Sequence, residues 1–239
     1  VTISGNTTTG DGGGIFIRDN SSPTLTDLTI SGNSADNGGG IYCQNNSIPT
    51  LTDVTIIANQ AGSEGNGVFT EGGSAPTVEN CNILQNGNGV YNYDPGTSVN
   101  FTDCYWGHSL GPYHPSQNSS GQGDSVNAYV NVTPWLTTPN TAAPPIPAQN
   151  LTVTSTGNDF ISLNWDASQL GDLAGYKLYY DSDSSGYPYA NSVDIGTDTS
   201  YTLSSLSLGT TYYLAVTTYD TDGNESWYSN EVSGVTRIM

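Results

Sequence analysis

The sequence predicts an all-β protein in two parts, a solenoid of stacked coils followed by a β-sandwich. Two observations lead to this prediction. Through the first part, one block of strand-forming residues recurs every 23 to 27 positions, and residues 12–33 are nearly repeated at 38–59. In the second part, short runs rich in Val, Thr and Tyr alternate with turn residues, and no segment has a helical period.

The recurring block is a three-residue strand with an apolar residue at its third position. A period of this length without helical pattern is typical of a solenoid whose coils stack strand on strand. The Leu-x-x-Leu-x-Leu pattern of leucine-rich repeats is absent, which leaves a parallel β-helix. The blocks are Val1-Thr2-Ile3, Leu28-Thr29-Ile30, Val54-Thr55-Ile56, Cys81-Asn82-Ile83 and Cys104-Tyr105-Trp106.

Each coil offers three strand candidates, and equivalent positions in successive coils form three apolar files. Because side chains alternate between the two faces of a strand, these files point inward and the intervening Thr and Ser point outward. The predicted files are Ile15, Ile41, Val68 and Val90; Leu25, Leu51, Val78 and Phe101; and Ile3, Ile30, Ile56, Ile83 and Trp106.

Polar residues mark the corners of each coil. Asp27, Asp53, Asn80 and Asp103 precede the third strand, and Asn6, Asn33, Asn59 and Asn86 follow it. Asx residues tolerate left-handed backbone, and stacked side chains can bond to each other along the axis. We expect corners that serve the bend, with a metal-binding Asp column as the less favoured alternative.

The three cysteines are odd in number and do not form a secreted disulfide framework. Cys81 and Cys104 take equivalent inward positions in adjacent coils, within the range that a disulfide permits. Parallel side chains point the same way, so we favour two buried thiols. Cys43 occupies the place of Ile17 and Thr70, and we expect it to be unpaired.

The first part resembles the right-handed parallel β-helix repeat proteins of bacterial secreted and surface proteins, over residues 1–138. Its end is the more specific feature, with Trp106-Gly107, Gly111-Pro112, Gly121-Gln-Gly-Asp124 and Pro134-Trp-Leu136. In such helices the chain stops coiling there. The resemblance implies that Trp135 and Leu136 cover the last coil.

A Pro-rich connector at residues 139–146 separates this part from residues 147–239, where about seven short strands predict a β-sandwich. The second part resembles a fibronectin type III domain across 144–236. The matching residues are Leu163-Asn-Trp165, Tyr176-Lys-Leu-Tyr179 and Leu206 to Tyr212, the last being the tyrosine-corner region. The resemblance implies a core role for Trp165 and a spacer, adhesion or assembly role for the domain.

The charge balance restricts the partners. The 239 residues carry a formal charge of −19 with three basic side chains, so we expect no binding to nucleic acid. No apolar run is long enough to span a bilayer. Little Lys with abundant Gly, Asn, Thr and Ser is typical of an exported β-rich protein, and we expect an extracellular or cell-surface location.

Catalysis has few markers. Lyases of the fold that this part resembles use calcium together with Lys or Arg. Residues 1–138 contain no Lys and a single Arg, Arg18. Hydrolases use paired carboxylates, and Asp27 and Asp53 are in register but sit at corners. His108 and His114 lack the companion ligands of a metal site, so cap packing or exposure is the better interpretation. We assign no catalytic residue.

No cofactor is expected, but two segments resemble the start of a calcium loop. Asp181-Ser-Asp183 and Asp220-Thr-Asp222-Gly-Asn224 have suitable spacing, although neither has the bidentate Glu at the twelfth place. These residues are therefore candidates for weak calcium binding.

An aromatic stripe is the stronger surface feature. Phe16, Tyr42, Phe69 and Tyr91 each follow the Ile/Val file by one residue, so alternation predicts four stacked rings on the outer face. Exposed aromatic patches mark interfaces, here for a glycan, for the second domain or for another subunit. The alternative is that adjacent Gly-rich loops shield the rings.

Val1 and Ile3 already hold file positions, so an exposed first rung is expected. Either upstream coils were removed or a second molecule docks there, and a head-to-tail contact of that kind propagates into a fibre. We therefore expect a non-catalytic extracellular structural or adhesion protein that self-assembles through the β-helix end or the fibronectin-like domain. A polysaccharide-active enzyme and a glycan-binding module are the alternatives.

Overall fold

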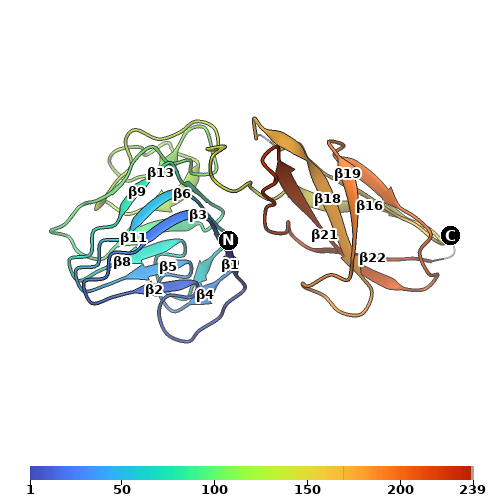
Figure 1. Ribbon diagram of the computed structural model, residues 1–239, viewed down its shortest axis with the longest axis horizontal. Helices are drawn as coiled ribbons and strands as arrows, with labels where there is room; N and C mark the ends of the chain where they lie inside the picture. Colours follow the sequence, from blue (N-terminus) through green and yellow to red (C-terminus); the bar gives the residue numbers. More distant parts are fainter. Residues whose placement is uncertain (169, 238–239) are drawn as a thin grey trace. The chain divides into compact units, whose positions relative to one another are not determined.

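The computed structural model describes residues 1–168 and 170–237, and the only regular elements in this part of the chain are strands (Figure 1). Consequently, none of these residues forms a helix that could cross a membrane. The chain divides into two compact units, Val1–Pro144 and Pro145–Met239. This confirms the all-β prediction.

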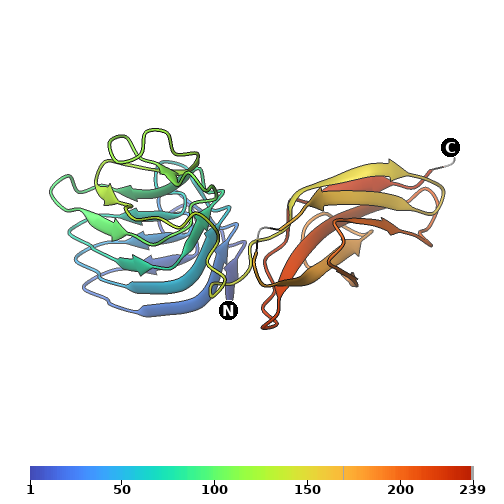
Figure 2. The same cartoon turned by 90° about the horizontal axis from the view of Figure 1, so that it is seen from above.

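The first unit is a solenoid of parallel strands, and Figure 2 shows its coils stacked in chain order. One sheet has the order β1-β3-β6-β9-β12-β15, with β10 also beside β6; the other has the order β13-β14-β11-β8-β5-β2. Their bounds are β1 (Thr2–Ser4), β3 (Thr24–Ser31), β6 (Thr50–Ile57), β9 (Thr77–Glu79), β10 (Asn82–Leu84), β12 (Val99–Phe101), β15 (Val130–Asn131), β2 (Ile15–Ile17), β5 (Ile41–Cys43), β8 (Val68–Thr70), β11 (Asn88–Asn92), β13 (Pro112–Tyr113) and β14 (Gly123–Val126). β4 (Ser34–Ala35) and β7 (Gln60–Ala61) form a separate parallel pair.

The three apolar files are in register, as predicted. Ile3 pairs with Ile30, Ile30 with Ile56, and Ile56 with Ile83. The files that begin at Ile15 and Leu25 are likewise continuous through the strand pairings. Most of these side chains are fully buried, and each contributes about 1.5–3 kcal/mol to the stability of the fold.

The corner residues that precede the third strand have left-handed backbone conformation. The φ angles of Asp27, Asp53, Asn80 and Asp103 lie between 52° and 55°, so the chain bends at the same place in four coils. Short Asx side chains tolerate this conformation better than other non-glycine residues do. The corner prediction is confirmed.

An asparagine ladder runs along the axis on the other side of the third strand. The backbone N–H and the Nδ2 of Asn33 both donate to Oδ1 of Asn59, at 3.0 Å each. Asn6 bonds in the same way to Asn33, and Asn59 to Asn86. Each Nδ2 in the middle of the ladder also donates to an isoleucine carbonyl of the preceding coil. Buried amides are thereby satisfied from coil to coil.

A carboxylate ends the ladder. Asp124 accepts hydrogen bonds from the backbone N–H and Nδ2 of Asn86, both at 2.9 Å, and from the backbone N–H of Gly87 at 3.0 Å. Burial raises the pKa of Asp124, while these donors act in the opposite direction. The sequence placed Asp124 in the terminating segment but gave no sign that it completes the ladder.

The cysteines are three free, buried thiols, as we interpreted them. Burial raises the pKa of Cys43 to about 12 and that of Cys104 well above its usual range. The Cys81 and Cys104 thiols donate to the carbonyls of Glu79 and Thr102. They act as small apolar residues of the interior.

The end of the solenoid is covered as expected. Leu136 bridges to Tyr105, and its N–H donates to the Cys104 carbonyl at 2.9 Å. Trp135 packs against the interior files. Gly111 makes room for this indole, because a Cβ there would lie 2.6 Å from the ring.

The second unit is a sandwich of two antiparallel sheets, in the orders β16-β17-β20 and β19-β18-β21-β22. Trp165 and Tyr176 lie in its core. The predicted tyrosine corner is present, since the Ser207 N–H donates to the Tyr212 hydroxyl oxygen at 3.1 Å. The strands are β16 (Gln149–Thr156), β17 (Ile161–Asp166), β18 (Leu173–Asp181), β19 (Asn191–Gly196), β20 (Ser200–Leu203), β21 (Thr211–Asp220) and β22 (Val232–Val235).

The Pro-rich connector is bonded at several points. Asn140 donates through Nδ2 to Oδ1 of Asp53 and to the Asn80 carbonyl, and it exchanges two hydrogen bonds with Asn82. The Thr55 hydroxyl donates to the Pro144 carbonyl at 2.6 Å. We call this set of contacts the Asn140 clamp. It attaches the start of the connector to the outer face of the solenoid.

We predict that Asn59→Ala lowers the free energy of unfolding of the first unit by about 3 kcal/mol, because two donors of Asn33 lose their acceptor in a buried site. Urea unfolding followed by circular dichroism measures this. Asn100→Ala is the matched control, since Asn100 is exposed and accepts one surface bond from Asn131. If both changes lowered the free energy of unfolding equally, the ladder would contribute no more to stability than a surface hydrogen bond.

Candidate functional site

The aromatic stripe forms a continuous stack on the outer face of the β2-β5-β8-β11 sheet; we call Phe16, Tyr42, Phe69 and Tyr91 the aromatic stack. Strand pairing sets the four residues in register. Successive ring centroids are 5.2, 5.1 and 5.7 Å apart. The Tyr42 and Phe69 rings are parallel within 2°. Tyr42, Phe69 and Tyr91 are stacked as predicted, whereas Phe16 meets Tyr42 edge to face, with planes at 79°.

The predicted exposure of the stack is wrong for its middle rings. Tyr42 and Phe69 are only 4% and 5% exposed, whereas Phe16 is 43% exposed. Neighbouring rings of the stack lie against both. Gly38 and Gly65, with φ values of 61° and 64°, pack against the base of these side chains, because an added Cβ would lie 2.8 and 2.7 Å from the Cβ atoms of Tyr42 and Phe69. Alternation identifies the outer face of a strand but not the neighbours that bury a side chain there.

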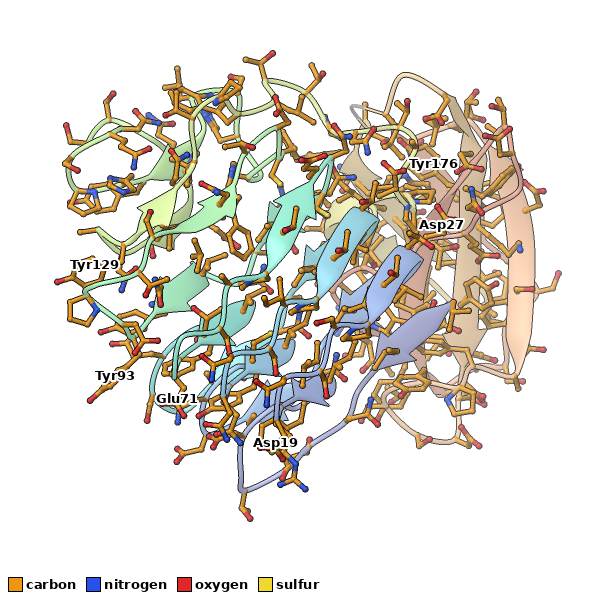
Figure 3. The ribbon with its side chains drawn as sticks, turned by 60° about the vertical axis from the view of Figure 1, so that its left-hand side comes forward. Asp19, Asp27, Glu71, Tyr93, Tyr129 and Tyr176 are labelled. Atoms are coloured by element: carbon orange, nitrogen blue, oxygen red, sulfur yellow. The ribbon has the colours of Figure 1, made fainter. Side chains whose placement is uncertain are left out.

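A carboxylate and a fifth ring extend the stack. The Tyr42 hydroxyl donates to Oε1 of Glu71 at 2.6 Å, and burial together with Glu71 raises the pKa of Tyr42. The ring of Tyr93 lies 6.3 Å from that of Phe69, and Tyr93 is 62% exposed. Figure 3 shows Tyr93 and Glu71 on the same side of the solenoid. Alternation could have found Tyr93, because it follows Tyr91 by two residues.

The accessible ring surface therefore lies mainly at Phe16, at one end of the stack, and at Tyr93, beside Phe69, while Tyr91 at the other end is half-buried. Phe16 also borders an open cavity of about 600 Å³ at the first coil. Within the described residues, the outer edges of β2 and of Thr24–Thr26 pair with no strand. The cavity is lined by Ile15, Phe16, Ile17, Arg18, Ser21, Ser22, Pro23 and Leu25.

The residues of the predicted first rung differ in exposure. Val1 is 87% exposed, while Ile3 is half-buried and paired with Ile30. The N-terminal ammonium of Val1 donates to the Asp27 carbonyl at 3.1 Å. The open apolar surface thus lies at Ile15 and Leu25, beside the residues that we predicted.

The structure does not bring a catalytic set together at the candidates. Asp27 and Asp53 are corner residues, and Oδ1 of Asp53 accepts the bond from Asn140. His114 is buried in the cap; its Nδ1 accepts the Ser116 and Gln117 N–H groups, and burial lowers its pKa. Nδ1 of His108 accepts the Leu110 N–H. No group of three His, Cys, Asp or Glu that could hold a metal occurs among residues 1–168 and 170–237.

The calcium candidates hold turns. Oδ1 of Asp181 accepts the Ser182 N–H, and Oδ2 accepts the Ala190 N–H. Oδ1 of Asp220 accepts the N–H groups of Asp222 and Asn224, and Oδ2 accepts the Asn224 side-chain amide. Asp183 donates its N–H to Asp181. These bonds explain why Asx residues occur at these positions.

A second aromatic group, which the sequence did not reveal, lies in the second unit. Tyr179, Tyr187, Tyr189, Trp227 and Tyr228 form what we call the tyrosine cluster. Tyr228 is at its centre, with ring centroids 5.0 to 6.1 Å from those of the other four. The rings come from β18 and from the segments before β19 and β22. In the sequence, the signal for this cluster was the presence of two aromatic residues in each of these two turn segments.

We predict that Phe69→Ala lowers the free energy of unfolding of the solenoid by about 3 kcal/mol or more, because a buried ring between two stacked rings is removed. Tyr93→Ala should cost less than about 1 kcal/mol, because the ring is mostly exposed. Thermal and urea unfolding measure both. A Phe69→Ala protein as stable as the Tyr93→Ala protein would show that the stack does not support the fold.

Comparisons with known proteins agree with this architecture. Residues 1–105 match the family described as the right handed beta helix region, and residues 144–235 match the fibronectin type III domain. Over 83 residues the chain is 34% identical to the Kelch domain-containing protein SSO1033 of Saccharolobus solfataricus, which covers 35% of this chain and 11% of that protein's length.

Solved structures resemble the second unit. The fibronectin type-III domain of human fibronectin type III domain containing protein 3 is 26% identical, with a TM-score of 0.35 and coverage of 41% of this chain and 90% of that one. An Fn3-like protein from Clostridium thermocellum is 23% identical, with a TM-score of 0.34 and coverage of 41% and 98%. By the two family matches, the chain contains a right handed beta helix region at residues 1–105 and a fibronectin type III domain at residues 144–235.

Proposed function

We propose that this is a non-catalytic extracellular protein with a structural and adhesive role, in which the β-helix is a stiff support and the fibronectin type III domain a module for contacts. Both domain types are typical of extracellular proteins. The observation that carries the proposal is the asparagine ladder from Asn6 to Asp124. A buried polar network in which every member is bonded favours one rigid arrangement.

The use of the recurring polar residues supports a structural role. The corner Asp and Asn residues adopt left-handed backbone, and the ladder amides bond to neighbouring coils. A catalytic pair needs carboxyl groups that face a substrate and exchange protons with it. The residues that recur here are instead engaged in bending and linking the coils.

Self-association is part of this proposal, and the open cavity beside Ile15, Phe16 and Leu25 is the contact that we favour. Its mostly apolar lining, with the half-exposed ring of Phe16, is the surface at this end of the β-helix through which we propose that two copies bind as a pair.

We predict that Leu25→Glu weakens the pair at least about tenfold, because it places a charge in the apolar contact. Sedimentation equilibrium of the full chain at physiological salt measures the dissociation constant. Asn100→Glu adds the same charge at an exposed position of β12 and should leave the constant unchanged. A wild-type protein that is monomeric at every concentration would refute self-association through this surface.

The rival function is polysaccharide cleavage, and it has a direct test. Incubation of the purified chain with a panel of neutral and acidic polysaccharides, followed by reducing-end analysis, should give no cleavage. Asp27→Asn and Asp53→Asn should leave that result and the circular dichroism spectrum unchanged. Cleavage by the wild type that either substitution abolishes would establish an enzyme and overturn the structural proposal.

A further inference from the structure

The tyrosine cluster lies on the outer face of the sheet that contains β18. Tyr179 is on β18 itself, next in alternation to the buried Leu178. The shortest ring contact joins Tyr187 and Trp227, with centroids 4.6 Å apart and planes at 82°. Tyr187 is 48% exposed, and Trp227 and Tyr228 are half-buried. Unlike the aromatic stack of the β-helix, this cluster presents ring surface to solvent.

Two carboxylates accept hydrogen bonds from two of the four tyrosine hydroxyls of the cluster. Glu225 accepts hydrogen bonds from Tyr179 at 2.7 Å, from Thr217 at 2.7 Å and from the Lys177 ammonium at 2.8 Å. Oε2 of Glu231 accepts the Tyr189 hydroxyl and the Gly186 N–H, both at 2.6 Å. The rings of Tyr179 and Tyr189 are therefore held in place before any partner arrives, which lowers the entropic cost of binding.

Of the two carboxylates that bond to the cluster, only Glu225 is paired with a cation among the described residues. Lys177 is the single lysine of the chain and forms an ion pair with Glu225. No ion pair to Glu231 occurs in the described part of the chain. Glu231 thus leaves the edge of an exposed aromatic surface with a negative charge that no cation of the described residues balances.

Charge complementarity selects the partner. The whole chain carries 22 acidic and three basic side chains, so an anionic polymer is repelled. A cation is attracted by the ring faces as well as by Glu231, because the face of an aromatic ring carries partial negative charge. The chain already contains such contacts: the Lys177 ammonium lies 5.8 Å from the centre of the Tyr179 ring, and the Arg18 guanidinium 5.7 Å from that of Phe16.

We propose that the tyrosine cluster binds an arginine-containing segment of another protein, with guanidinium groups stacked on the exposed rings and Glu231 as a counter-ion. Arginine fits better than lysine, because its planar group stacks on rings and can form two parallel bonds to a carboxylate. This binding is independent of the contact at the open end of the β-helix. It gives the fibronectin type III domain a heterotypic partner.

The test measures binding of the full chain to fluorescent nine-residue peptides by anisotropy. A peptide of alternating Gly and Arg should bind more tightly than its Gly/Lys counterpart, and Gly/Ser and Gly/Glu peptides should not bind. Tyr187→Ala should raise the dissociation constant of the Gly/Arg peptide about fivefold or more. Trp227→Phe keeps an aromatic ring and should retain most of the affinity.

The charge contribution has its own matched pair of variants. Glu231→Gln should weaken binding of the Gly/Arg peptide several-fold, whereas Glu79→Gln, which removes the same charge from an exposed position of the β-helix, should have no effect. Equal losses in these two variants would mean that net charge alone attracts the peptide, and would overturn the site.

Glycan binding is the competing outcome. Cellohexaose and xylohexaose, which are neutral, serve as competitors and as direct ligands in calorimetry. The proposal predicts no heat of binding and no displacement of the Gly/Arg peptide. Binding of either sugar that Tyr187→Ala abolishes, with no binding of the arginine peptide, would replace the proposal with a carbohydrate site.

Discussion

The first unit depends on one constraint: equivalent residues of successive coils must lie directly over each other, because each coil satisfies the polar groups of the next. The Asn33 amide needs the side chain of Asn59 at one place and the Ile3 carbonyl at another. Shifting a strand by one residue would break these bonds and turn its apolar file outward. The register, the left-handed corners and the covered ring file all follow from this requirement.

Aromatic residues serve a different purpose in each of the two units. In the aromatic stack, strand pairing determines the spacing of the rings, and Tyr42 and Phe69 are almost fully buried between their neighbours. In the tyrosine cluster, rings from three separate segments meet around Tyr228 and keep solvent-exposed surface. Rings that are buried between coils stabilise the fold, whereas rings that remain accessible are available to a partner.

Features that repeat could be predicted from the sequence, and features that depend on distant segments could not. The files through Ile30 and Ile41 follow from period and alternation alone. Alternation places Phe69 on the outer face of its strand but does not show that neighbouring side chains bury it there, and Asn140 meets Asn80 across 60 residues of sequence. The tyrosine cluster has no periodicity, so only the folded chain brings Tyr187 to Trp227.

The Asn140 clamp has a mechanical consequence. The Pro144 carbonyl is bonded to Thr55 of the β-helix, and the Ile146 carbonyl is bonded to Thr218 of the second unit, so Pro145 alone separates the two anchored residues. Tension applied through the fibronectin type III domain is therefore delivered to Thr55, Asp53 and Asn82 in the middle coils. Trp135 and Leu136 do not make these contacts. The last coil that they cover is therefore not the first part of the β-helix to bear the force.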